Sequence, residues 1–211
     1  MPINFFHRRP VEPAADSTTP VFLLIGLGNP GREYRENRHN IGFMIIDRLA
    51  TDTGVKLTRV QNRALTGSGM LGEAKVILAK PQTYMNLSGE SVSALMRFYK
   101  VEPEHLMVIY DDIDLPFGML RLRPGGGSAG QKGVQSIIER IGSQDFPRLR
   151  FGIGRPAGSK VGAGYVLKNF SAEEQKEMPF MIDAAAAAVR LYISDGLEAA
   201  MNRYNGSQLE D

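Results

Sequence analysis

The chain has 211 residues, 43 % of them hydrophobic, and a formal net charge of +2, values that predict one domain with a packed core. It contains no cysteine, which excludes disulfides, thiolate metal sites and cysteine nucleophiles. No apolar run has the length of a membrane-spanning helix, and residues 1–20 lack the apolar region of a signal peptide, so we expect a cytoplasmic protein that does not bind membranes.

The two ends of the chain differ in composition from its centre. Residues 1–20 are rich in proline and small polar residues, and we interpret them as a disordered N-terminal tail. The folded domain is expected over residues 21–205, and residues 206–211 are expected to form a C-terminal tail. No internal repeat or linker divides the domain.

Six segments have the hydrophobic patterns of strands. Three are continuous apolar runs, which are typical of buried strands, at residues 21–25, 75–79 and 106–110. Three are more amphipathic, at residues 64–70, 119–123 and 148–153.

Helical patterns lie between these strands. An apolar helix is expected over residues 41–50, directly after the first strand and its loop. Apolar residues spaced three and four apart predict a helix that ends near Tyr99, with Ser88 as its N-cap. The same spacing predicts a helix over 134–141 that ends at Gly142, a residue suited to the position after a helix.

The C-terminal quarter of the chain is predicted to be helical. Ser171 and Glu174 have the spacing of a capping box. The alanine-rich run from Met181 to Tyr192 favours a helix that stops near Gly196. Strands that alternate with helices predict an α/β fold, a single-domain three-layer sandwich whose central, mostly parallel sheet has helices on both faces.

The first loop carries the leading candidate for a catalytic base. His39 ends the run GLGNPGREYRENRH, which lies between the first predicted strand and the first predicted helix. An imidazole at such a junction, flanked by amides and arginines, suits proton transfer on an anionic substrate. The other histidines are His7, in the predicted tail, and His105, in an acidic loop.

Two glycine patterns suggest other functions. The run Gly26-x-Gly28-x-x-Gly31 matches a dinucleotide fingerprint, and a nucleotide-dependent oxidoreductase is one alternative. However, Pro30 removes a backbone N–H that a phosphate would need. The segment 126–130 matches a nucleophile elbow around Ser128, but no histidine follows this serine. We interpret the segment as a flexible loop that can bind an anion.

Polar side chains follow two of the buried strands. Asp111, Asp112 and Asp114 follow the strand at 106–110, where the sites of open α/β sheets lie. No histidine is near them in the sequence, so we expect no metal site. One of the carboxylates can orient an imidazole, as an acid does beside a catalytic base. Helix or turn capping is the alternative for the others.

The segment after the strand at 75–79 offers three different groups. Tyr84, Met85 and Asn86 supply an aromatic face, a thioether and an amide, which can stack on a base or hydrogen-bond to a peptide. The alternative is that Tyr84 and Met85 belong to the core and that Asn86 caps a helix.

Charge is unevenly distributed along the chain. Residues 117–160 contain eight basic residues and two acidic ones, whereas residues 171–211 contain eight acidic residues and three basic ones. One basic region on a nearly neutral protein predicts an anionic partner, with nucleic acid as a leading option. A solvated surface with chance clustering is the alternative.

Taken together, these segments resemble the bacterial-type peptidyl-tRNA hydrolase family from about Val21 to about Tyr204. The matching pieces are GLGNPGREYRENRHNIGF, KPQTYMNLSGESV, YDDIDLPFGMLRLRPGGGSAG, IGSQDFPRLRFGIGRP and YVLKNF. The resemblance implies a monomeric α/β domain with a mixed, twisted sheet and no cofactor. It implies an enzyme that cleaves the ester between a peptide and the 3′-terminal ribose of tRNA, which recycles tRNA dropped from ribosomes.

The resemblance also implies roles for individual residues. His39 matches the catalytic base, Asp111 the acid that hydrogen-bonds it, and Asn29 the amide that recognises a blocked amino group. The positions that match substrate contacts are Tyr34, Tyr84, Met85 and Asn86. The positions that match basic residues holding tRNA phosphate are Arg121 and Arg150.

One motif departs from the family pattern. Where the family usually has Gly-Gly-His-Asn-Gly, this chain has Ala129-Gly130-Gln131-Lys132-Gly133. Lys132 cannot accept a hydrogen bond, so either another amide replaces the asparagine or Lys132 binds phosphate. Related chloroplast proteins serve in intron splicing, so a non-catalytic RNA-binding protein is the alternative function. The presence of His39, Asp111, Asn29 and Asn86 favours the enzyme.

Overall fold

Eight strands form a single sheet in the computed structural model, which describes residues 19–155 and 164–209. The strands are β1 Val21–Gly26, β2 Arg59–Gln61, β3 Ala64–Leu71, β4 Ala74–Pro81, β5 Leu106–Asp112, β6 Met119–Arg123, β7 Arg148–Gly152 and β8 Gly206–Ser207. All six predicted strands are therefore confirmed. Strands β2 and β8 were not predicted, because they are too short to show a hydrophobic period. Residues 206–207, assigned to a tail from the sequence, pair with β6.

The order of strands in the sheet is β2-β3-β4-β1-β5-β7-β6-β8. The central strands β4, β1, β5 and β7 run parallel to one another, while antiparallel pairs extend the sheet at both edges. The sheet is therefore mixed, with a parallel centre. The carboxyl ends of its central strands meet at one edge, which is where open α/β sheets bind their ligands.

Five α-helices and four short 3₁₀ helices connect the strands within the described residues. The α-helices are α1 Ile41–Thr53, α2 Ser88–Tyr99, α3 Lys132–Ile141, α4 Ala172–Asp195 and α5 Leu197–Tyr204. The 3₁₀ helices are η1 Arg32–Tyr34, η2 Arg38–Asn40, η3 Met85–Leu87 and η4 Pro103–His105. None of these helices is long and apolar enough to cross a membrane.

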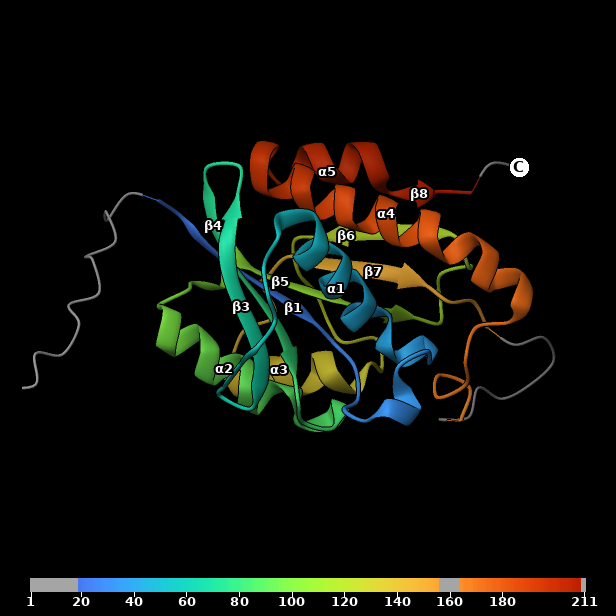
Figure 1. The fold of residues 1–211 in the computed structure, drawn as a ribbon, viewed down its shortest axis with the longest axis horizontal. Coiled ribbons are helices and arrows are strands. Elements are labelled where there is room, and N and C mark those ends of the chain that lie inside the picture. Colours follow the sequence, from blue (N-terminus) through green and yellow to red (C-terminus); the bar gives the residue numbers. More distant parts are fainter. Residues whose placement is uncertain (1–18, 156–163, 210–211) are drawn as a thin grey trace, which may run out of the picture.

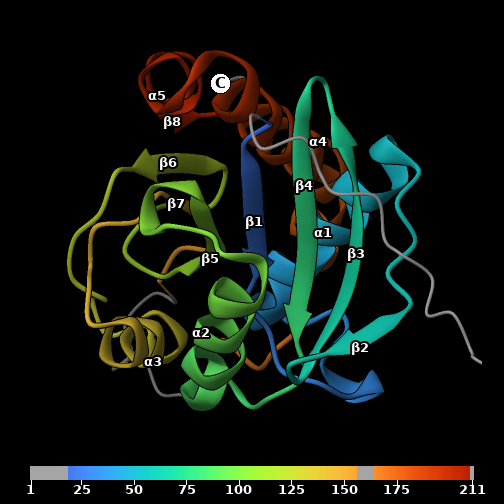
Figure 2. The ribbon, with the colours of Figure 1, turned by 90° about the vertical axis from the view of Figure 1, so that its left-hand side faces the viewer.

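Helices cover both faces of the sheet, so the predicted three-layer sandwich is confirmed. Figure 1 shows α4 and α5 along one side of the sheet and α2 and α3 along the other, and Figure 2 shows the same layers after a quarter turn. Alternate residues of β1 point to the two sides: Leu24 packs in the core with α1 and α4, and Leu23 packs in the core with α2 and α3. Both cores therefore hold β1, the strand that leads to His39.

Four of the five helix termini predicted from the sequence are confirmed, including the ends of α2 at Tyr99 and of α4 before Gly196. Ser171 accepts a hydrogen bond from the Glu174 backbone N–H, and the Glu174 side chain accepts one from the Ser171 N–H, so the capping box is confirmed. Gly142 takes the left-handed conformation after α3, as expected. The prediction that Ser88 is an N-cap is wrong. Because η3 runs directly into α2, Ser88 is the first residue of the helix, and its hydroxyl donates to the Met85 carbonyl at 2.9 Å.

Helix α1 approaches the strands closely through Gly42. A Cβ atom at this position would collide with backbone atoms of Leu27 and Ile109, neither of which can move without disturbing β1 or β5. Because η2 leads directly into α1, this close contact also sets the distance between His39 and β5. The glycine at position 42 is therefore required by packing at the base of the loop.

We expect Gly42→Ala to lower the free energy of unfolding by about 1–3 kcal/mol, the usual cost of an overpacked core site. Urea unfolding followed by circular dichroism measures this change as a lower midpoint. Gly127→Ala is the matched control, because a Cβ there meets open space and the backbone needs no left-handed conformation. Equal midpoints for the two variants would contradict this account of the packing.

Candidate active site

His39 and Asp111 meet at the carboxyl end of β5, although 72 residues separate them in the sequence. His39 lies in η2, and its Nδ1 atom is 2.8 and 2.9 Å from the two carboxylate oxygens of Asp111. The Asp111 side chain is 2 % exposed and the His39 side chain is 13 % exposed. With Nδ1 directed at the carboxylate, Nε2 is the nitrogen left for chemistry in the cavity that His39 lines.

A cavity of about 480 Å³ opens beside this pair. Ten residues were predicted from the sequence to act in catalysis or in binding of substrate or tRNA. Seven of them line this cavity: Asn29, His39, Tyr84, Met85, Asn86, Asp111 and Lys132. The other three, Tyr34, Arg121 and Arg150, do not. The cavity therefore gathers residues from four separate segments of the chain around the exposed edge of the imidazole.

Asn40 joins the loop after β1 to η2, and the sequence analysis missed it. Its Oδ1 accepts a hydrogen bond from the Asn29 backbone N–H at 2.9 Å, and its Nδ2 donates to the Asn29 carbonyl at 2.9 Å. The pair is buried, with Asn40 only 2 % exposed. This reciprocal contact fixes Asn29 relative to His39. The signal in the sequence was an amide directly after the candidate base and directly before a helix.

Asn29 has only one polar group left for a ligand. Its Oδ1 accepts a hydrogen bond from the Met85 backbone N–H at 2.9 Å, which also attaches η3 to the loop. Its backbone N–H and carbonyl are bonded to Asn40. The Nδ2 group therefore remains, and it can only donate. Asn29 is thus suited to contact a carbonyl oxygen.

The structure distinguishes between the two interpretations that the sequence left open for Tyr84, Met85 and Asn86, as ligand contacts or as core residues and a helix cap. Met85 is buried in the core between the sheet and α3, and it also lines the cavity. Tyr84 is 63 % exposed, so it is not a core residue. Asn86 is exposed and lies within η3, while Leu87 is the residue at the N-cap of α2. The structure therefore offers an aromatic ring and an amide at the mouth of the cavity.

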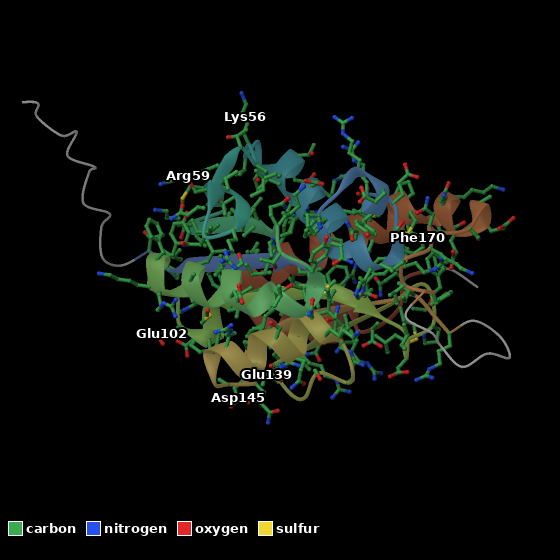
Figure 3. All side chains as sticks on the ribbon, turned by 90° about the horizontal axis from the view of Figure 1, so that it is seen from below. Lys56, Arg59, Glu102, Glu139, Asp145 and Phe170 are labelled. Atoms are coloured by element: carbon green, nitrogen blue, oxygen red, sulfur yellow. The ribbon has the colours of Figure 1, made fainter. Side chains whose placement is uncertain are left out.

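The buried Arg38 holds another wall of the cavity in place. Its guanidinium lies over the rings of Tyr165 and Phe170, at 4.7 and 5.2 Å, and pairs with Glu174. The neighbouring His39 backbone N–H donates to the Val166 carbonyl at 2.9 Å. In Figure 3 Phe170 and Glu102 lie at opposite ends of the molecule. Because Glu102 precedes β5, Phe170 lies on the side where the carboxyl ends of the parallel strands meet. No pattern in the sequence indicates that this arginine is buried.

The glycine-rich segment before α3 forms the facing wall. Arg148, only 2 % exposed, donates to the Gly127 and Gln144 carbonyls at 2.8 and 2.9 Å. Next to it, burial raises the pKa of the Tyr110 hydroxyl, an effect that the charge of Arg148 partly offsets. The Ser128 hydroxyl donates to the Gln135 side chain at 2.8 Å. The Ser128 hydroxyl therefore donates to an amide rather than to a base, which is not the setting of a nucleophile.

Four of the seven described basic residues of the predicted basic region pair with a carboxylate or are buried. Arg150 pairs with Asp112, Arg155 with Asp114 and Arg140 with Glu90, while Arg148 is buried against carbonyls. Lys160 lies outside the described residues. Within the part of the chain that the structure describes, the members of this region that are neither ion-paired nor buried against carbonyls are Arg121, Arg123 and Lys132. The charge available to an anionic partner is therefore smaller than the sequence count.

Arg121 and Arg123 share one face of the sheet with Arg150. On β6 and β7, alternate residues such as Leu122 and Leu149 enter the core with α4, which leaves the arginines on the α3 side. Arg121 stands opposite Arg150 in the antiparallel pair. Since β7 pairs with β5, this arginine face begins one strand away from Asp111.

The three carboxylates at the carboxyl end of β5 have separate basic partners. Asp111 contacts His39, Asp112 pairs with Arg150, and Asp114 pairs with Arg155. Over residues 19–155 and 164–209, no group of three or more acidic, histidine or cysteine side chains is arranged to hold a metal ion. The chemistry that this arrangement offers is proton transfer by an imidazole that a carboxylate orients.

The glycines of the first loop are used for packing. Gly28 lies against the ring of Phe43, and α1 begins at Ile41, ten residues after Gly31. A dinucleotide fold needs a helix to start within the glycine motif, so that its N-terminus meets the pyrophosphate. In this loop only the three-residue 3₁₀ helix η1 directly follows the glycines, and no α-helix starts there.

Comparison with known proteins agrees with this geometry. The family model described as Peptidyl-tRNA hydrolase matches residues 23–211. The peptidyl-tRNA hydrolase of Desulforamulus reducens is 51 % identical over 183 residues, which cover 87 % of this chain and 88 % of that protein. The chloroplastic peptidyl-tRNA hydrolase of Arabidopsis thaliana is 46 % identical, and the match covers 87 % of this chain but 64 % of that longer protein. The solved structure of peptidyl-tRNA hydrolase from Acinetobacter baumannii has a TM-score of 0.83 at 37 % identity, covering 89 % of this chain and 95 % of that one.

Proposed function

The chain belongs to the peptidyl-tRNA hydrolase family and cleaves the ester bond of peptidyl-tRNA, and we propose that His39, oriented by Asp111, is the general base of this reaction. The observation that carries the proposal is the contact between His39 Nδ1 and the buried Asp111 carboxylate at the edge of the cavity. It leaves Nε2 to accept a proton from water.

The proposed reaction needs no covalent intermediate, because an ester is more labile than an amide. Neutral His39 takes a proton from a water molecule through Nε2, and the water oxygen attacks the ester carbonyl carbon. The bond from that carbon to the ribose oxygen then breaks, and the imidazolium returns its proton to the ribose oxygen. Asp111 stabilises the imidazolium and keeps the ring in place.

Amide side chains seat the substrate in this proposal. The Nδ2 group of Asn29 donates to a carbonyl oxygen of the peptide, since its Oδ1 is already used by Met85. Asn86 is exposed, also lines the cavity and supplies a second amide. Tyr84 offers its ring for stacking. Tyr34 lies outside the cavity, so we assign it to a part of the substrate that extends beyond this space.

The tRNA lies along the arginine face in this proposal. Arg121 and Lys132 make no ion pair with other described residues, and Arg150 uses its Nε atom for Asp112 while its terminal nitrogens remain for phosphate. All three are close in the fold to β5 or to the cavity. We also propose that the protein acts as a monomer in the cytoplasm, where ribosomes release its substrate.

The test of the proposed function is the cleavage of an N-blocked aminoacyl-tRNA by the full chain. We expect the release of free tRNA and of the blocked amino acid. Gel electrophoresis follows the tRNA, and scintillation counting follows the amino acid. Binding of the tRNA without cleavage would instead indicate a non-catalytic RNA-binding protein.

Lys132 gives a separate prediction about the phosphate contacts. We expect Lys132→Asn to raise KM by about 3- to 10-fold with little change in kcat, because a cation at the cavity edge is lost. The slope of log kcat/KM against log salt should become shallower by about 0.7–0.9, the contribution of one phosphate contact. Steady-state assays at several salt concentrations measure both.

Lys56→Asn is the control for this change of charge. Lys56 is exposed, and in Figure 3 it projects from the side of the molecule opposite Glu139 of α3. It should leave the salt slope unchanged. A faster Lys132→Asn enzyme with an unchanged slope would mean that this position works better with an amide and holds no phosphate.

A further inference from the structure

The side chain of Gln131 connects the N-terminus of α3 to the Asp111 carboxylate. Its Oε1 accepts hydrogen bonds from the backbone N–H groups of Gly133 and Val134, at 2.6 and 3.0 Å. Its Nε2 donates to Asp111 Oδ1 at 3.2 Å and contacts the Met85 sulfur at 3.5 Å. One amide therefore bonds both a helix terminus and the carboxylate that contacts His39.

The two ends of this amide cannot exchange places. Only an oxygen can accept from the two N–H groups at the start of α3, and only an N–H group can donate to a carboxylate. If the amide rotated by half a turn, its NH₂ group would face the N–H groups at the start of α3, and its oxygen would face the Asp111 carboxylate. The helix terminus thus selects the orientation in which Gln131 donates to Asp111.

A helix cap alone does not require glutamine. Serine, aspartate and asparagine are the residues preferred at an N-cap, because their shorter side chains reach the same backbone groups with less loss of freedom. The greater length of Gln131 is what allows its Nε2 to reach Asp111. Gly133 leaves room for this arrangement, since a Cβ there would collide with the Met85 sulfur and crowd Gln131 Oε1.

We propose that Gln131 is a positioning residue, which acts on His39 through Asp111 by fixing the carboxylate and sharing its negative charge. This inference rests on the proposed role of His39 and Asp111. Asp111 Oδ1 receives both the imidazole and the amide, so the carboxylate is held from two directions. A carboxylate with two donors is restrained in orientation, and the imidazole bonded to it is restrained with it.

Gln131→Ser tests the proposal, because serine keeps the helix cap but is too short to reach Asp111. We expect kcat to fall by about 3- to 10-fold, the effect of one hydrogen bond, with KM little changed. The acidic limb of the kcat–pH profile should move to higher pH by about half a unit, because the full Asp111 charge then favours the protonated, inactive imidazole. A wild-type kcat and pH profile in Gln131→Ser would overturn the proposal.

A double-mutant cycle shows whether Gln131 acts through Asp111. Gln131→Ser should lower kcat in the wild-type enzyme but not in Asp111→Asn, where the charged carboxylate is already lost. An equal loss in both backgrounds would overturn the proposal. The His39→Ala enzyme separates the two claims: if it remains active, the proposed base is wrong, whereas an inactive His39→Ala with an unaffected Gln131→Ser refutes only the positioning role.

Discussion

Replacement of His39 by alanine is expected to lower kcat for cleavage of an N-blocked aminoacyl-tRNA by about 10²- to 10⁴-fold, the usual contribution of a general base. The loss should fall on kcat, because the imidazole acts on water and the substrate is held by other groups. Single-turnover cleavage with excess enzyme measures the chemical step directly. The residual rate should be nearly independent of pH between about 5 and about 8, because no imidazole then acts as the base.

His105→Ala is the matched control for this experiment. His105 lies in η4, and its ring packs edge-on against Phe22 at the start of β1, 4.9 Å between ring centres. The cavity lies beyond the other end of that strand. The control should therefore retain the wild-type kcat even if its stability falls. A His39→Ala enzyme with near-wild-type turnover would remove His39 from the mechanism.

The strands and the loop that bears His39 could be predicted because their signals are local. The apolar run at 106–110 identifies β5, and the carboxylates that follow it had to lie at the carboxyl end of the strand. The run before His39 is bounded by a strand and a helix in the same way. What periodicity cannot provide is the distance between His39 and Asp111, because it depends on the order of β1 and β5 in the sheet. Only the family resemblance suggested their contact.

The environment of the charged residues could not be predicted from composition. Arg38 and Arg148 have the same side chain as any surface arginine, yet each is buried and bonded to backbone carbonyls. The partner of Arg150 is Asp112, and the two are brought together by the pairing of β5 with β7. A count of basic residues treats all of them as available to phosphate. Their role in the fold appears only once the strands are placed.

The contacts of Gln131, within the candidate site, could not be predicted from the sequence either. The sequence marks it as a departure from the family pattern, but a departure does not reveal which atoms the new side chain contacts. The hydrogen bonds at the start of α3 determine that it faces Asp111 with an N–H group. A substitution in the motif thus becomes interpretable through the helix terminus that orients it.

Asp111→Asn is expected to lower kcat by about 10- to 150-fold, because a hydrogen bond to a charged partner contributes about 1.5–3 kcal/mol. Asparagine keeps the shape of the side chain but removes the charge that stabilises the imidazolium. It also has a single acceptor oxygen, for which Gln131 and His39 then compete. If the Asn oxygen accepts from Gln131, the Asn N–H group donates to His39 Nδ1. The imidazole proton then resides on Nε2, the nitrogen that must be unprotonated to act as a base.

Asp112→Asn tests whether this loss is specific to the dyad. Asp112 follows Asp111 on β5 and pairs with Arg150 rather than with His39, so its variant removes one buried charge at nearly the same place. It should change KM through Arg150 and leave kcat within about threefold of wild type. Equal falls in kcat for the two variants would point to a general disturbance of the strand. A wild-type kcat in Asp111→Asn would mean that His39 needs no ionic partner to act as the base.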